Sequence, residues 1–179
     1  SQTKTPTKIF IHKFAAQKSS QDSPLIVMIH GSLENGRIFY SRDNQKGLAP
    51  FLAKKGLDCF VVDGRGKGKS IPQLSRKVDY SQYQAICDLA EVRLHLSHLF
   101  PHKKQIWISH SWGGVLTNCM LLRSKQNHIV GLIHFGTKRR VTTFNLQKKI
   151  GLDLVFCKMM RWQSLIEGFV SPKIYGSDG

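Results

Sequence analysis

IWISHSWGG, residues 106–114, joins an apolar, strand-like run to a small-x-Ser-x-Gly pattern. A helix is expected to begin directly after this pattern, at Gly114. A serine held on so sharp a turn needs a small residue two positions to either side, because strand and helix come close together and the backbone is strained. Ser109 and Gly113 are those small residues. The stretch therefore predicts a strand, a tight turn with Ser111 at its tip, and a helix.

This predicted turn makes Ser111 a candidate nucleophile. It would hold the serine hydroxyl above a sheet and at a helix N-terminus, where the backbone amide of Trp112 points at an oxyanion that develops beside it. The plainer interpretation is that Ser111 is only the N-cap residue of the following helix. Taken alone, the stretch does not separate these two interpretations.

Strand-like and helix-like segments alternate along the chain. The expected strands are a short β-type segment at residues 8–14 and four buried strands at residues 25–29, 57–63, 105–109 and 128–135. The expected helices cover residues 47–55, 80–99 and 114–124. Strands that are apolar at consecutive positions are suited to burial on both faces. The alternation therefore indicates an α/β fold with a doubly wound, mostly parallel sheet.

The pattern changes after residue 140. Residues 141–179 carry apolar side chains at helical spacing among basic residues, and no further buried strand follows. We expect residues 1–140 to form the α/β core and residues 141–179 to begin a helical cap or insertion. Phe156, Met159, Met160 and Trp162 could line an acyl pocket there, although such a stripe is more often the buried face of a helix.

Two further motifs follow the first two buried strands. His30-Gly31-Ser32 ends the first, where a glycine lets the backbone turn and aim the amide of Ser32 or Leu33 at the same oxyanion. DGRGKGKS, residues 63–70, ends the second, with Asp63 and Arg65 in a glycine-rich loop. We expect Arg65 to shape this loop beside the site, whereas Lys67 and Lys69 are as well explained by a flexible basic loop.

With these three motifs in this order, residues 8–138 resemble the α/β-hydrolase superfamily. The resemblance implies that Ser111 is the nucleophile and that the amides of Trp112 and of Ser32 or Leu33 form the oxyanion hole. It also implies hydrolysis of an ester, thioester, lipid or peptide-type acyl bond in a small-molecule or lipid substrate, with no metal and no organic cofactor. The residues that would support the site are His30, Gly31, Asp63, Arg65, Ser109 and Gly113. Ser109 replaces the glycine that is commoner at its position, a mild departure.

The remaining triad members are a more serious departure, because the family places its acid and its histidine after the nucleophile, in that order. The acids and histidines after Ser111 are Asp153, Glu167, Asp178, His128 and His134. Neither histidine follows an acid, and both belong to the expected strand at residues 128–135, which favours packing roles. His110 is rejected as the base because neighbouring side chains on a turn diverge.

Two explanations fit the incomplete triad. The sequence is either the N-terminal part of a longer hydrolase or a degenerate member that binds without cleaving. We expect the first, because the sheet also lacks its last strands. The strand at residues 129–135 would then be an apolar sheet edge, open to association.

A nucleotide-binding loop is the rival interpretation of residues 63–70. Gly68-Lys69-Ser70 matches the end of the P-loop pattern, but Asp63 stands where that pattern needs its first glycine. A phosphate loop must also run straight into a helix, and Pro72 with its polar neighbours does not favour one.

Charge and cysteine content narrow the class of protein further. The 179 residues carry a net charge of +16, in small groups without a long basic tail, so we expect no nucleic-acid partner. The charge instead suits a solvated surface that favours anionic substrates or peripheral contact with anionic membranes. Four cysteines stand far apart and are expected to be free thiols. No apolar run is long enough to span a bilayer, which predicts a cytoplasmic protein.

Overall fold

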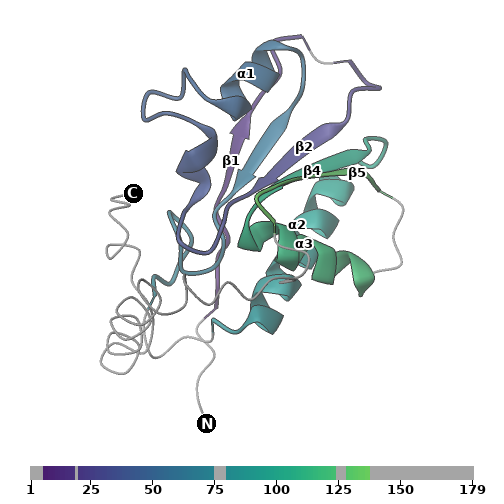
Figure 1. Cartoon of the computed structure of the whole chain (residues 1–179). Coiled ribbons are helices and arrows are strands. Elements are labelled where there is room, and N and C mark those ends of the chain that lie inside the picture. Colours follow the sequence, from purple (N-terminus) through teal and green to yellow (C-terminus); the bar gives the residue numbers. More distant parts are fainter. Residues whose placement is uncertain (1–5, 19, 75–79, 124–127, 138–179) are drawn as a thin grey trace, which may run out of the picture.

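A computed structural model describes residues 6–18, 20–74, 80–123 and 128–137 (Figure 1). In chain order the elements are β1 (Ile11–Phe14), β2 (Leu25–Ile29), the 3-10 helix η1 (Gly36–Phe39), α1 (Leu48–Lys54), β3 (Cys59–Val62), α2 (Gln82–Leu99), β4 (Gln105–His110), α3 (Trp112–Leu122) and β5 (Ile129–Phe135). The predicted cap at residues 141–179 lies outside the described residues.

The strands form one five-stranded sheet in the order β1-β3-β2-β4-β5. β1 is antiparallel to β3, and the other neighbours are parallel. Ile29, the last residue of β2, pairs with Val62 of β3 on one side and with Ser109 of β4 on the other. The predicted α/β class with a mostly parallel sheet is confirmed.

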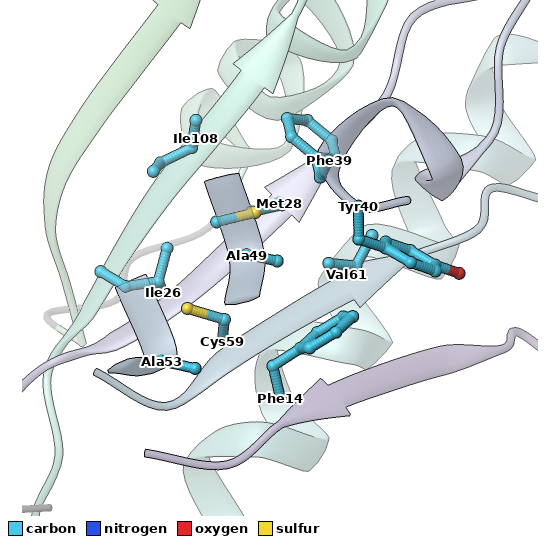
Figure 2. Packing of buried hydrophobic residues seen from close by; sticks show 10 residues of the cluster. All are labelled: Phe14, Ile26, Met28, Phe39, Tyr40, Ala49, Ala53, Cys59, Val61 and Ile108. Carbon is cyan, nitrogen blue, oxygen red and sulfur yellow. The ribbon is translucent and has the colours of Figure 1, made fainter. Parts of the chain in front are cut away.

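Helices cover both faces of the sheet, as the buried runs of β2 and β3 require. Every residue of β2 is buried, and alternate side chains go to opposite faces. On one face Ile26 and Met28 pack under α1 and η1, in the cluster that Figure 2 shows. On the other face Leu25, Val27 and Ile29 pack against α2 and α3.

β5 departs from the prediction of a fourth buried strand. Val130 is 58% exposed and Phe135 is 51% exposed. Within the described residues β5 pairs only with β4 and lies at the edge of the sheet, so the burial expected from its apolar sequence is wrong for these side chains.

The order of the strands decides where a site can form. From β2 the chain passes to β3 on one side and later to β4 on the other. The sheet order therefore changes direction at the carboxyl ends of β2 and β4, and such a switch point is the crevice where ligands bind in open α/β sheets. The motifs at His30 and Ser111 follow β2 and β4 directly, so both lie at this crevice.

Within the described residues, no helix is long and apolar enough to cross a membrane, and no group of three or more His, Cys, Asp or Glu side chains is placed to hold a metal ion. Cys59, Cys87 and Cys119 are free thiols, as predicted, and Cys157 lies outside the described residues.

Candidate active site

The turn at Ser111 has the strained backbone that the sequence pattern predicts. Ser111 has φ 49° and ψ −116°, a region that residues with a Cβ atom rarely occupy. Its amide donates to the carbonyl oxygen of Phe135 at 2.8 Å. Its own carbonyl oxygen accepts from the amide of Gly114 and from the hydroxyl of Thr137, both at 3.1 Å. These bonds on both sides hold the turn in place.

The Ser111 hydroxyl does not cap the helix that follows. α3 begins at Trp112, two residues before the predicted start, and Ser111 occupies its N-cap position. The side chain makes no capping hydrogen bond, however, and no other described residue makes a hydrogen bond to it. Among the described residues the hydroxyl therefore has no partner, and the missing capping bond removes the plainer interpretation of this serine.

Close packing joins the turn to the loop after β2. A Cβ atom added to Gly31 would lie 3.3 Å from Cβ of Ser111, and one added to Gly113 would lie 2.9 Å from the carbonyl oxygen of Ile29 and collide with that of His30. Glycine is needed at Gly113 because the start of α3 approaches the backbone at the end of β2 so closely, whereas at Gly31 the added atom would meet the side chains of Glu34, His110 and Ser111.

Glu34 fastens this loop to the end of β4. One oxygen of its carboxylate, Oε2, accepts from the amide of Gly31 at 3.0 Å and from Nδ1 of His110 at 2.7 Å. The His110 ring is thus turned toward Glu34, in agreement with its rejection as the base for Ser111. Sequence reasoning missed Glu34; its only signal was a carboxylate three residues after Gly31, close enough to accept from that amide.

His30 connects the loops after β2 and β3. Its Nδ1 donates to the carbonyl oxygen of Gly31 at 2.6 Å, and its Nε2 accepts from the amide of Gly64 at 2.9 Å. The side chain is buried, and burial lowers its pKa, so the ring is neutral. A neutral ring with one donor and one acceptor nitrogen fits both bonds.

The glycine-rich loop is built around the Asp63 carboxylate. Its two oxygens accept from the amides of Gly36 at 2.7 Å and Lys69 at 2.8 Å. The buried Ser70 hydroxyl donates to the carbonyl oxygen of Asp63. A protein carboxylate therefore occupies the place where a P-loop would hold a phosphate, and the next described helix begins only at Gln82. This geometry excludes the P-loop interpretation.

Arg65 connects the same loop to α2. Its Nε and one terminal nitrogen bind the two oxygens of Asp88 at 2.6 and 2.7 Å, a two-point contact with little exposure of either side chain. Sequence reasoning did not find Asp88, because the buried face of α2 was identified from its apolar residues alone.

A serine–histidine contact lies within the sheet, at the serine two residues before Ser111. The Ser109 hydroxyl is 3.0 Å from Nδ1 of His134, whose Nε2 is 3.2 Å from the Asn118 amide oxygen. Ser109 is fully buried in the sheet, so a substrate cannot reach it. This contact joins β4, β5 and α3, and it fits the packing role expected for His134.

A cavity of about 190 Å³ opens beside the turn. Apolar side chains from β2, β3, α2 and α3 form most of its wall, with Gly31, Ser32 and Trp112 at the end nearest Ser111. In the described part of the chain, the amides of Ser32 and Trp112 have no hydrogen-bond acceptor, whereas the amide of Gly31 is taken by Glu34. Within the described residues, two amides without an acceptor thus line the cavity, one on the residue after Ser111 and one on the residue after Gly31.

Comparison with known proteins identifies the family. The model of the alpha/beta hydrolase fold matches residues 24–155, which include the turn, the loop after β2 and the glycine-rich loop. The chain belongs to the α/β-hydrolase family. No curated protein matches this chain in sequence.

Several solved structures share its fold. An esterase from Exiguobacterium antarcticum is 25% identical, with a TM-score of 0.58 over 79% of this chain and 46% of its own. A mature lipase from Bacillus licheniformis is 19% identical, with a TM-score of 0.60 over 93% and 59%. An epoxide hydrolase described as putative, from Pseudomonas aeruginosa, is 18% identical, with a TM-score of 0.55 over 96% and 51%. The chain therefore spans about half the length of these structures.

Proposed function

We propose that this hydrolase cleaves ester-type acyl bonds with Ser111 as the nucleophile. The observation that carries the proposal is the hydroxyl on a strained turn together with the two amides that line the cavity, none of which has a partner among the described residues. Ser111 attacks the carbonyl carbon, the carbonyl oxygen becomes an oxyanion, and the amides of Ser32 and Trp112 donate to it. We favour Ser32 over Leu33 as the second donor, because Ser32 lines the cavity and Leu33 does not.

The supporting residues act by holding these groups in place. Glu34 and His30 fix the loop that presents the Ser32 amide, and the bonds at Phe135 and Thr137 fix the turn. Donors that are already in position need no reorganisation when charge develops, which is the main source of their catalytic effect.

The base that takes the Ser111 proton is not among the described residues. His110 bonds to Glu34, and His134 bonds to Ser109 and Asn118, and neither ring makes a hydrogen bond to the hydroxyl. We assign the base to a residue outside the described ranges, and the tests below therefore use the full-length protein.

Labelling with a fluorophosphonate probe tests the nucleophile. Ser111→Ala should abolish labelling, whereas Ser109→Ala should keep it, because Ser109 is buried and bonded to His134. Labelling that survives Ser111→Ala would remove the assignment. Wild-type protein that binds acyl ligands without being labelled would instead support the alternative, a non-catalytic binding module on the same fold.

Crowding Gly31 tests the oxyanion hole. A side chain at this position meets Glu34 at 2.8 Å and Ser111 at 3.3 Å, so Gly31→Val should displace the loop that presents the Ser32 amide. Loss of one such donor typically lowers kcat by about 10²–10³-fold. A variant with unchanged kcat would place the second donor elsewhere.

A further inference from the structure

The charges of the side chains that line the cavity do not sum to zero. They are Arg65, Lys67 and Asp88. Arg65 and Asp88 neutralise each other in their two-point contact. Lys67 makes no hydrogen bond or ion pair through its side chain with any described residue. Among the described residues, the positive charge of Lys67 on the cavity wall therefore has no partner.

Lys67 is not an ordinary solvated lysine of a basic loop. It is only partly exposed, and burial lowers its pKa. Its charge also lowers the pKa of His30, which lines the same cavity. Lys69, two residues later, is exposed and does not line the cavity, and its ammonium lies 5.0 Å from the centre of the Phe10 ring. The two lysines of this loop thus have different surroundings.

We propose that Lys67 makes this cavity select acyl substrates that carry a carboxylate, such as half-esters of short dicarboxylic acids. A partly desolvated cation in a mostly apolar wall gains most from an anion on the ligand, because little water competes for it. This inference rests on the proposed function, since Ser32 and Trp112, the proposed oxyanion donors, line the same cavity.

The size of the cavity limits the length of the substrate. A volume of about 190 Å³ is below the range of about 300–1,000 Å³ that is usual for ligand pockets, so a short acyl group fits it better than a long lipid chain. That space suits an acyl chain of about five carbons that ends in a carboxylate, as in glutarate. The reacting carbonyl then lies at the end with the two amides, and the carboxylate meets Lys67.

The test compares two p-nitrophenyl esters of equal acyl length, the anionic hemiglutarate and the neutral valerate, on the full-length protein. Lys67→Met should lower kcat/KM for the hemiglutarate by about 10–100-fold, chiefly through KM, which is the usual effect of losing a hydrogen bond to a charged group. The valerate should change by less than about twofold, because it makes no such bond. Lys67→Arg should restore most of the hemiglutarate activity.

Lys69→Met is the matched control, because it removes the same charge from the same loop outside the cavity. It should leave the preference between the two esters unchanged. An equal loss in Lys67→Met and Lys69→Met would mean that the net charge of +16 attracts anions in general, and the proposal would fail. Equal effects of Lys67→Met on both esters would overturn it as well. Thermal melting of each variant checks that it is folded.

A binding measurement separates this inference from the proposed function. Calorimetry with glutarate and with valerate needs no catalysis. If neither ester is cleaved but glutarate binds and Lys67→Met abolishes that binding, the hydrolase proposal fails and the anion site stands. If the wild type cleaves valerate esters and does not bind glutarate, the hydrolase proposal stands and the role of Lys67 is refuted.

Discussion

Replacing Ser111 with glycine should stabilise the protein relative to replacing it with alanine, although both changes remove the nucleophile. At φ 49° and ψ −116° a residue with a Cβ atom carries about 1–3 kcal/mol of strain. Glycine is free of that strain but costs about 0.5–1 kcal/mol more in chain entropy. Ser111→Gly should therefore be more stable than Ser111→Ala by about 1 kcal/mol.

Ser97 provides the matched control. It is a serine of α2 with ordinary helical backbone, and its hydroxyl donates to the carbonyl oxygen of Arg93. Both Ser97→Gly and Ser97→Ala lose that bond and the one that the Ser97 hydroxyl accepts from Gln105, so their difference reports the backbone and the buried Cβ atom. Here glycine should be less stable than alanine by about 1 kcal/mol, the usual difference inside a helix. The sign of the glycine–alanine difference should thus reverse between the two serines.

Equilibrium urea unfolding of the full-length variants measures both differences, and fluorophosphonate labelling checks that neither Ser111 variant reacts. If Ser111→Gly is less stable than Ser111→Ala by the same amount as at Ser97, the turn carries no strain. That result would refute the reasoning that the fold holds Ser111 in a costly conformation for its chemistry.

Three further outcomes follow from the geometry. Gly113→Ala should destabilise by about 1–3 kcal/mol, because the new methyl group meets backbone oxygens at the end of β2; Gly131→Ala, whose nearest contacts are 3.5 Å or longer, should shift the melting temperature little. Asp88→Ala removes the buried two-point contact with Arg65 and should cost about 3 kcal/mol in urea unfolding, with part recovered when Arg65→Met is added; no recovery would mean that the pair is not the cause. Burial lowers the pKa of His30 below its usual 6.5, so the unfolded chain binds more protons than the folded protein as pH falls below about 6.5, and the free energy of unfolding should decrease by up to about 1.4 kcal/mol per pH unit. Between pH 7.5 and 5, the free energy of unfolding should change less steeply with pH in His30→Gln than in the wild type. An unchanged pH dependence would assign the effect to other groups.

The sequence by itself determined the local units of this protein. β2, β3 and β4 were recognisable from their runs of apolar residues, and α2 from apolar residues at helical spacing. Both patterns involve only residues that are close in the sequence. The turn at Ser111 was predictable for the same reason, because its small neighbours Ser109 and Gly113 lie within two positions. At this turn the predicted start of α3 was two residues late, since the serine itself takes the N-cap position.

Only the tertiary structure decided which side chains meet around that serine. Glu34 and His110 are 76 positions apart in the sequence, and Arg65 and Asp88 are 23 apart, so no local sequence pattern predicts either contact. They meet because parallel pairing aligns the carboxyl ends of β2 and β4 and because α2 packs over one face of the sheet. Tertiary packing also distinguishes Lys67 from Lys69, two lysines of the same basic loop. Lys67 lines the cavity, whereas the ammonium of Lys69 lies over the Phe10 ring.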